Sequence, residues 1–232
     1  MSKVNDKAAA SLTRKAKDPG EHETHLARLI LGLRSQGVTD PAVLAAIERT
    51  PRDLFTPDLF KDRSWEDSAL PIACGQTISQ PFIVGLMTQA LTLEPRARVL
   101  EIGAGSGYQT SILARLSRLV YTVERYRTLL REAEARFAAL QLTNIITRFG
   151  DGSLGWPEQA PFDRIMVTAA AQDEPAVLLK QLKPSGVLVA PVGKGAVQKL
   201  CRYAGDGAGG FAMEVLCEVR FVPLLDGVAK EL

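Results

Sequence analysis

The sequence predicts an α/β protein built on a doubly wound, mostly parallel sheet of seven strands. From about residue 95 onward, short apolar runs alternate with longer segments of helical periodicity. This alternation is typical of a parallel sheet covered by helices on both faces. The chain of 232 residues, 46% of them hydrophobic, is also long enough to bury the core of one sizeable domain.

The N-terminal part of the chain is expected to be helical. In residues 21–36 apolar side chains recur at helical spacing, at Leu26, Leu29, Ile30 and Leu33. Asp40 and Pro41 have the form of an N-cap followed by a proline at the first helical position, which predicts a short helix to about residue 49. A third amphipathic helix is expected over residues 82–93.

The sheet region is predicted element by element from the same alternation. The parallel strands are expected at residues 98–102, 119–123, 144–148, 164–168 and 187–190. The helices between them are expected at residues 108–116, 127–140 and 175–182. Residues 199–203 and 215–221 flank the glycine-rich segment 205–210, so they predict a C-terminal hairpin that adds two antiparallel strands to the sheet edge.

Charge and cysteine usage limit the partners. The formal net charge is +2 and the basic residues are spread out, so no basic block indicates nucleic-acid binding. No segment resembles a signal peptide or a membrane span. Three widely spaced cysteines fit neither a disulfide framework nor a zinc site. We therefore expect a cytoplasmic monomer that binds no nucleic acid and no membrane, with a disordered tail at residues 1–20 and one domain at 21–232.

The most specific local pattern is a strand that runs into a glycine-rich turn, VLEIGAGSG at residues 99–107. At the carboxyl ends of the strands in an α/β sheet, glycines allow the backbone to approach a bound ligand closely. The dinucleotide fingerprint needs its third glycine at position 108, where this chain has Tyr108. The glycines stand instead at 103, 105 and 107, so the pattern does not indicate a dinucleotide.

Two acidic residues favour S-adenosylmethionine as the ligand. Glu101, just before the glycines, would repel a pyrophosphate but attract the ammonium and sulfonium of this cofactor. Glu124, at the end of the next strand, is positioned to accept both ribose hydroxyls. The alternative is a structural turn with two solvated acids. Asp151, after the third strand, could accept the adenine amino group or form an Asp-Gly turn, and its spacing does not decide between them.

The shortage of histidine limits the chemistry. The only histidines are His22 and His25, far from the glycine loop, and no cluster has metal-ligand spacing, so we expect neither a histidine base nor a metal. An amine or hydroxyl acceptor usually needs a base, whereas a carboxylate with a pKa of about 4 is already ionised at neutral pH. A carboxylate acceptor needs only positioning and removal of water, for which hydroxyls and amides suffice.

Several motifs together resemble the protein-L-isoaspartate O-methyltransferase family. They are ALPIACGQTISQP (69–81), VLEIGAGSGYQT (99–110), TVER (122–125), GDG (150–152), PFDRIMVTAAA (161–171), LKPSGVLVAPVG (182–193) and VRFVPL (219–224). The glycine motif is shared with many methyltransferases, whereas GQTISQP is specific to this family. The resemblance covers roughly residue 26 to the C-terminus.

The resemblance implies a class I, Rossmann-like methyltransferase that transfers a methyl group from S-adenosylmethionine to the free carboxyl of L-isoaspartyl residues in damaged proteins. It implies a helical and substrate-loop region at residues 21–94 and a cofactor-binding sheet at 95–232. It also implies a role for each of several residues. The catalytic residue is Ser79, the substrate contacts are Gln76, Thr77, Ile78 and Gln80, and the cofactor contacts are Glu101, Gly103, Ala104, Gly105, Glu124, Asp151 and Gly152.

The sequence leaves alternatives open. Ser79 could serve only as the N-cap of the helix that follows it. The family commonly has a glycine and then a polar residue where this chain has Ala73 and Cys74, and Cys74 is expected to be a packing residue because nothing nearby lowers its thiol pKa. The competing functions are a related methyltransferase acting on another carboxylate and a non-catalytic protein that binds S-adenosylmethionine.

Overall fold

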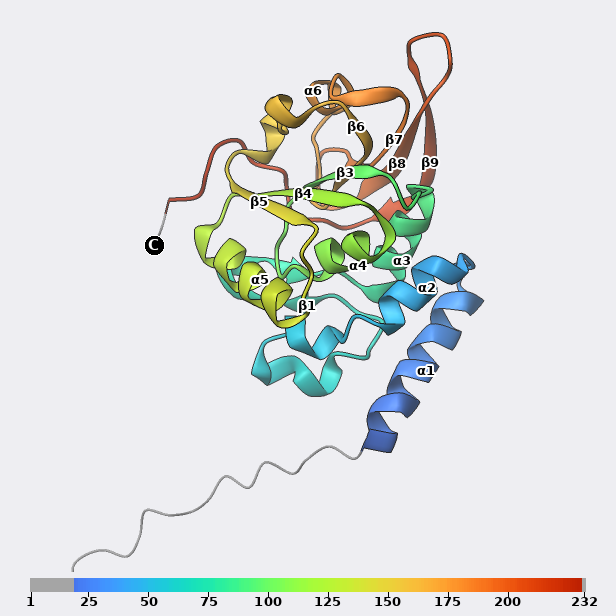
Figure 1. Ribbon diagram of the computed structural model, residues 1–232, viewed down its shortest axis with the longest axis vertical. Coiled ribbons are helices and arrows are strands. Elements are labelled where there is room, and N and C mark those ends of the chain that lie inside the picture. Colours follow the sequence, from blue (N-terminus) through green and yellow to red (C-terminus); the bar gives the residue numbers. More distant parts are fainter. Residues whose placement is uncertain (1–18, 231–232) are drawn as a thin grey trace, which may run out of the picture.

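The protein consists of a twisted seven-stranded sheet with helices on both faces (Figure 1). The computed structural model describes residues 19–230. The predicted tail at residues 1–20 therefore lies outside the described residues, except for 19 and 20, where the first helix begins. Within the described part of the chain, no helix combines the length and the apolar character needed to cross a membrane.

Apart from the short strands β1 and β2, which the sequence pattern does not predict, the elements follow one another in the predicted order. The helices are α1 (Pro19–Ser35), α2 (Pro41–Glu48), α3 (Pro81–Ala90), α4 (Tyr108–Leu116), α5 (Arg127–Ala139) and α6 (Ala176–Leu179). The strands are β1 (Leu70–Pro71), β2 (Thr77–Ile78), β3 (Arg98–Ile102), β4 (Leu119–Glu124), β5 (Ile145–Phe149), β6 (Phe162–Val167), β7 (Leu182–Val192), β8 (Gln198–Gly205) and β9 (Phe211–Val219).

The strand order in the large sheet is β5-β4-β3-β6-β7-β8-β9. The first five of these strands are parallel, and β8 and β9 add to the edge in antiparallel fashion. The chain winds outward in both directions from β3, so the order reverses between β3 and β6. Ligands bind at such a reversal, beyond the carboxyl ends of the strands. The predicted fold class is confirmed, including the C-terminal hairpin.

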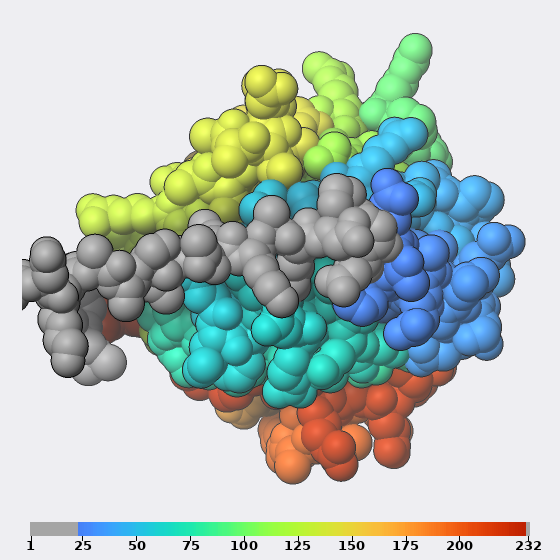
Figure 2. Space-filling view, turned by 90° about the horizontal axis from the view of Figure 1, so that it is seen from below, coloured from blue at the N-terminus to red at the C-terminus, as the bar shows by residue number. Residues whose placement is uncertain are grey.

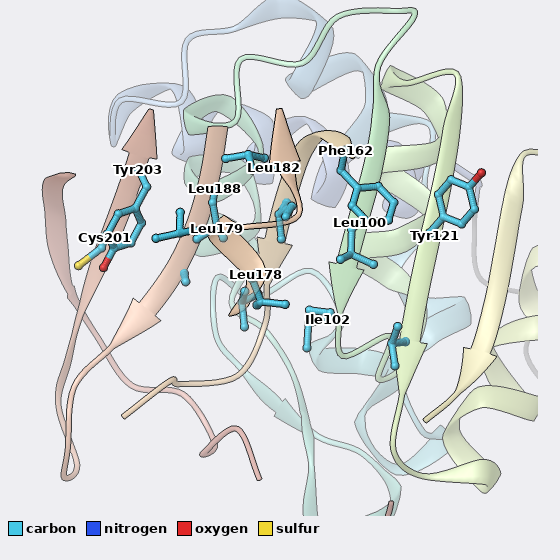
Figure 3. Close-up of a cluster of buried hydrophobic side chains, with 14 residues drawn as sticks. Leu100, Ile102, Tyr121, Phe162, Leu178, Leu179, Leu182, Leu188, Cys201 and Tyr203 are labelled. Carbon is cyan, nitrogen blue, oxygen red and sulfur yellow. The ribbon is translucent and has the colours of Figure 1, made fainter. Parts of the chain in front are cut away.

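Successive side chains along each strand point to opposite faces of the sheet, so a hydrophobic core forms on each face. On the α6 face, side chains of neighbouring strands gather around Leu100, Ile102, Phe162 and Leu188 (Figure 3). On the opposite face, Val99 packs with residues of α3 and α4. Glu101 lies between Leu100 and Ile102 in β3, so it faces the α4 side.

The N-terminal helices form a third layer against α4, and Figure 2 shows their blue and cyan surface. The Asp40 carboxylate caps α2 by accepting the N–H groups of Ala42 and Val43, as the sequence predicts. The Gln89 side chain of α3 accepts the N–H groups of Thr39 and Asp40. These bonds fix the N-terminal layer to α3, the helix that follows residues 69–80.

Several element boundaries differ from the sequence expectation; for example, β7 begins at residue 182 instead of 187, and α3 ends at residue 90 instead of 93. The helix expected at residues 175–182 is only the single turn of α6, because Leu182 already pairs with Phe162 as the start of β7. The Gln181 side chain bonds Trp156 N and Leu154 O, which fixes this early turn into the strand. The last strand, expected at 215–221, runs from Phe211 to Val219.

Candidate functional site

A cavity of about 320 Å³ lies at the carboxyl ends of β3, β4 and β6, where the strand order reverses. Its walls come from six parts of the chain: the β1–β2 hairpin, the glycine loop with the end of β3, the end of β4, the turn at Gly152, the segment after β6 and the C-terminal segment after β9. The lining includes Gly75, Gln76, Thr77, Ser79, Gly103, Gly105, Glu124, Arg125, Tyr126, Gly152, Thr168 and residues 221–225.

The glycine loop adopts backbone angles that favour glycine. Gly103, Gly105 and Gly107 all have positive φ, at 94°, 54° and 87°. Gly103 N donates to Val123 O at 2.8 Å, which fastens the loop to the neighbouring strand. A methyl group on Gly103 would collide with the Thr168 hydroxyl. Gly103 and Gly105 line the main cavity, and Ala104 lines a small cavity of about 40 Å³ beneath it.

Glu124 lines the cavity with its carboxylate held by the backbone. Its Oε2 accepts the Gly105 N–H at 2.8 Å and its Oε1 accepts the Tyr126 N–H at 2.9 Å. The side chain is only 4% exposed, and burial raises its pKa while these hydrogen bonds lower it. Each oxygen retains a second lone pair, so the carboxylate can still accept hydroxyl groups from a ligand.

Glu101 is fully buried and is not part of the cavity lining. Its Oε2 accepts the hydroxyls of Thr110 and Thr122, at 2.5 and 2.6 Å, and its Oε1 has no partner among the described residues. Burial raises the pKa of Glu101 to about 8, although the two threonine bonds act in the opposite direction. In the free protein near neutral pH this carboxyl group is therefore mainly uncharged.

Gly152 lines the cavity, and Asp151 precedes it in the turn after β5. Asp151 Oδ1 accepts the N–H and the hydroxyl of Ser153, and Oδ2 accepts Gly227 N at 2.7 Å. Burial alone would raise the pKa of Asp151, but these bonds outweigh it and the net shift is downward. Gly152 lines the cavity, whereas Asp151 supports the turn and the C-terminal segment from outside the lining.

The segment ALPIACGQTISQP forms a small hairpin rather than an open linker. Strands β1 and β2 pair at Leu70 with Ile78 and at Pro71 with Thr77. Both Leu70 and Ile78 are buried in the core of the N-terminal layer, so any contact of Ile78 with a substrate would have to come from its backbone. At the tip, Cys74 is exposed and takes a left-handed conformation with φ 58°, so the expectation that it is a packing residue is wrong.

Ser79 lies where three cavities meet. It lines the main cavity, the small cavity beneath it and a second cavity of about 420 Å³ toward β9. Gln80, not Ser79, stands at the N-cap position of α3, and the Asp67 carboxylate accepts Phe82 N there at 2.8 Å. The Ser79 hydroxyl thus has no capping role and makes no hydrogen bond within residues 19–230.

The other predicted substrate residues surround Ser79. Thr77 lines the same three cavities, and Gln76 lines the main one. Gln80 lines the second cavity, and its amide donates to Asp67 Oδ2 at 3.1 Å. The loop therefore brings hydroxyl and amide groups together at one edge of the cavity.

Sequence reasoning missed the C-terminal segment and Arg125. Ala170 N donates to Val222 O and Leu224 N donates to Ala170 O, so residues 222–224 run alongside the chain after β6 and close one side of the cavity. Ala229 N then donates to Arg125 O. The VRFVPL motif singled out this stretch, but only the long-range pairing shows that it returns to the cavity.

Neither a histidine nor a metal cluster belongs to this site in the part of the chain that the structure describes. His25 lies on α1 and is not a lining residue of the main cavity, while the side chain of His22 falls outside the described part. Among the described residues, no three His, Cys, Asp or Glu side chains are grouped to hold a metal ion. The lining combines backbone amides, hydroxyls, side-chain amides, the buried carboxylate of Glu124, the cation Arg125 and the apolar side chains of residues 221–225.

Comparison with known proteins gives a consistent result. Residues 24–229 match the sequence model of the protein-L-isoaspartate(D-aspartate) O-methyltransferase (PCMT) family. A protein-L-isoaspartate O-methyltransferase of Caulobacter sp. (strain K31) is 80% identical over 209 residues, which cover 90% of this chain and 96% of that protein. One of Maricaulis maris (strain MCS10) is 59% identical over 210 residues, or 90% and 98% of the two chains.

Two solved structures share the fold. One protein-L-isoaspartate O-methyltransferase has a TM-score of 0.76 and 28% identity over 85% of this chain, which spans 65% of that longer chain. A Plasmodium falciparum protein described as a putative protein-L-isoaspartate O-methyltransferase, in complex with S-adenosyl-L-homocysteine, has a TM-score of 0.76 and 24% identity over 87% and 98% of the two chains.

The glycine loop and Glu124 at the point of strand reversal, the hydroxyl-rich hairpin beside them and the family match over residues 24–229 all agree. This chain belongs to the protein-L-isoaspartate(D-aspartate) O-methyltransferase family of S-adenosylmethionine-dependent enzymes.

Proposed function

We propose that this chain transfers a methyl group from S-adenosylmethionine to the free carboxylate of L-isoaspartyl residues in damaged proteins and peptides, which initiates their repair. The observation that carries the proposal is the position of Ser79. Its hydroxyl is free of local hydrogen bonds and lies between the main cavity and the second cavity. One side suits a nucleoside and the other is open to a polypeptide.

The residues of the main cavity fit the cofactor. Backbone of Gly103, Ala104 and Gly105 can approach it closely, because two of these positions carry no side chain. Glu124, oriented by Gly105 N and Tyr126 N, would accept the ribose hydroxyls. Glu101 is buried outside the cavity lining, so its unpartnered Oε1 would act on the cationic end of the cofactor through charge and not by direct contact.

Gly152 would form the part of the cavity wall that contacts adenine, and the hydrogen bonds of Asp151 would hold that wall in place. A Cβ on Gly152 would strike the Ile102 side chain, so the backbone there lies close against the end of β3. Asp151 holds this wall through Ser153 and Gly227. When bound, S-adenosylmethionine supplies an electrophilic methyl group on a positively charged sulfur.

The chain's own residues then have to orient an acceptor and exclude water. An ionised carboxylate carries its own nucleophilic oxygen, which explains why the site can dispense with a general base. We propose that Ser79 and Thr77 donate hydroxyl hydrogen bonds to the isoaspartyl group, while the amides of Gln76 and Gln80 contact its backbone. The apolar side chains of the C-terminal segment would keep water from the nucleophile.

Replacement of Ser79 tests this role. Ser79→Ala should lower kcat on an isoaspartyl peptide about 10- to 100-fold, because the acceptor loses an orienting donor, and should leave the S-adenosylmethionine Kd within about twofold. Ser185→Ala is a matched control, since Ser185 is exposed in β7 and lines none of these cavities. A Ser79→Ala enzyme with unchanged kcat would remove Ser79 from the mechanism.

We further propose that the protein acts as a monomer in the cytoplasm. The three cysteines are free, which suits a reducing compartment that keeps thiols out of disulfides. Burial raises the thiol pKa of each, so they stay protonated and less reactive near neutral pH. Sedimentation at micromolar concentration tests the oligomeric state, and a dimer would contradict it.

A further inference from the structure

The second cavity is lined by two opposite charges, neither of which forms an ion pair within the described chain. Its lining is Ala69, Thr77, Ser79, Gln80, Ile83, Val197, Glu218, Val219, Arg220 and Phe221. Arg220 and Glu218 are both exposed, and neither side chain forms an ion pair or hydrogen bond within residues 19–230. Two such charges in a cavity that reaches Ser79 are available to a substrate.

The backbone that carries Arg220 is fixed on both sides. Before it, Val219 pairs with Gln198 at the end of β9. After it, Phe221 N donates to Gln198 Oε1 at 2.9 Å, and Gln198 is itself buried and bonded to Gly195 O. Two residues beyond Arg220, Val222 O accepts Ala170 N. Arg220 therefore projects from a rigid strand end and not from a free terminus.

The charges on the two sides of Ser79 differ in their surroundings. In the main cavity the charged lining residues are Glu124 and its neighbour Arg125, at the end of β4 and on the side assigned to the nucleoside. In the second cavity the one cation among the described lining residues is Arg220. Thr77, Ser79 and Phe221 line both cavities, so a group at their junction is within reach of each.

We infer that Arg220 is the residue that draws the acceptor carboxylate of the substrate into the junction beside Ser79, and that Glu218 opposes it. This inference rests on the proposed function, because it requires an anionic acceptor. An isoaspartyl residue presents its free carboxylate directly on the chain, where a normal peptide bond presents a neutral amide. A cation at this position distinguishes the two before any chemistry occurs.

The exposure of Arg220 suits such a task. A buried, bidentate ion pair would hold the carboxylate strongly and reduce its nucleophilicity, whereas a solvated arginine attracts it weakly and releases it to the hydroxyl donors. Attraction of this kind acts on encounter and ground-state binding, and it falls with ionic strength. Arg220 should therefore affect KM and leave kcat almost unchanged.

The test measures binding without turnover. The probe is an N-acetylated, C-amidated peptide in which isoaspartate supplies the only carboxylate, and its control carries a carboxamide in place of that carboxylate. Both are titrated against the full-length protein saturated with S-adenosylhomocysteine. We expect wild type to prefer the carboxylate, and Arg220→Met to lose about fivefold or more in affinity for it at low salt while the carboxamide Kd stays the same.

Further variants should change the affinity for the carboxylate peptide in opposite directions. Arg220→Lys should retain part of the preference, and Glu218→Gln should strengthen binding of the carboxylate peptide about twofold because a like charge is removed. Arg118→Met is the matched control, since Arg118 is exposed just before β4, toward the opposite edge of the sheet. Added salt should reduce the difference in Kd for the carboxylate peptide between wild type and Arg220→Met, because it screens the charge.

The outcomes separate this inference from the proposed function. If wild type neither binds nor methylates the isoaspartyl peptide, the proposed function fails. If wild type does both and Arg220→Met keeps the same preference for carboxylate over carboxamide, Arg220 has no such role and the inference is overturned. A loss of S-adenosylhomocysteine affinity in Arg220→Met would also count against it, because that would indicate a general disturbance of the site.

Discussion

Glu101 should make the stability of this protein depend on pH in an unusual direction. Its carboxyl group is fully buried, accepts two threonine hydroxyls on one oxygen and has a second oxygen without a partner among the described residues. Glu101→Gln keeps an oxygen for the two threonines and replaces the ionisable group by a neutral one. The variant therefore mimics the protonated carboxyl group at every pH.

The magnitude follows from the two pKa values. Burial raises the pKa of Glu101 in the folded protein to about 8, against an ordinary value of 4.5. Between these values the folded state holds a proton that the unfolded state has released, so stability falls as pH rises. Each pH unit in that window changes the free energy of unfolding by about 1.4 kcal/mol at most. From pH 5.5 to 7.5, wild type should lose about 2 kcal/mol relative to Glu101→Gln.

Urea unfolding of the two ligand-free proteins at pH 5.5, 6.5 and 7.5, followed by circular dichroism, measures this difference. Contributions from other titrating groups are common to both proteins and cancel. Wild type should approach or exceed the variant at pH 5.5 and fall behind it at pH 7.5. If the gap between the two changes by less than about 0.5 kcal/mol over this range, the burial argument for Glu101 is wrong.

Four further predictions concern the site. Glu124→Gln should weaken S-adenosylmethionine binding about tenfold in calorimetry, since it replaces a charged acceptor; an unchanged Kd would exclude a ribose contact. Cofactor binding near pH 7 should release a proton if Glu101 ionises against the ligand's ammonium, which titrations in buffers of different ionisation enthalpy would detect as a buffer-dependent heat. Gly103→Ala should abolish cofactor binding and lower Tm, because its methyl group meets the Thr168 hydroxyl at a positive φ; wild-type values would refute the close approach. Cys74→Asn should be about 1 kcal/mol more stable than Cys74→Ala in urea, since asparagine tolerates the left-handed conformation at this position; equal stabilities would contradict it.

The sequence predicts the sheet well where local pattern and burial coincide. Strand β3 is buried along almost its whole length, so its apolar run marks it as a central parallel strand. Strand β9 is different, because residues 212–215 are exposed and carry no burial pattern of their own. Its start is set by pairing with β8, from Gly205 opposite Phe211 onward, and no local signal encodes that register.

The site likewise contains residues whose positions the local sequence predicts and others whose positions depend on long-range contacts. The glycine loop follows β3, and Glu124 ends β4, the next strand along the chain after α4. Because the carboxyl ends of neighbouring parallel strands lie at the same edge of the sheet, this spacing predicts that the two come together. The surroundings of Glu101 depend on threonines of α4 and β4 that converge only in the fold, and these turn an apparent surface acid into a buried one. The capping of α3 by Asp67, which leaves Ser79 free, is likewise a contact between segments that no helix-capping rule would pair.

Methyl transfer to matched peptides tests the central claim most directly. The full-length protein is incubated with labelled S-adenosylmethionine and three peptides of one sequence that contain isoaspartate, aspartate or asparagine at a single position, and base-labile methyl ester is counted. A free carboxylate held at the junction of the cavities beside Ser79 predicts ester on the isoaspartyl peptide alone. Equal labelling of the aspartyl peptide, or cofactor binding with no ester on any peptide, would contradict it.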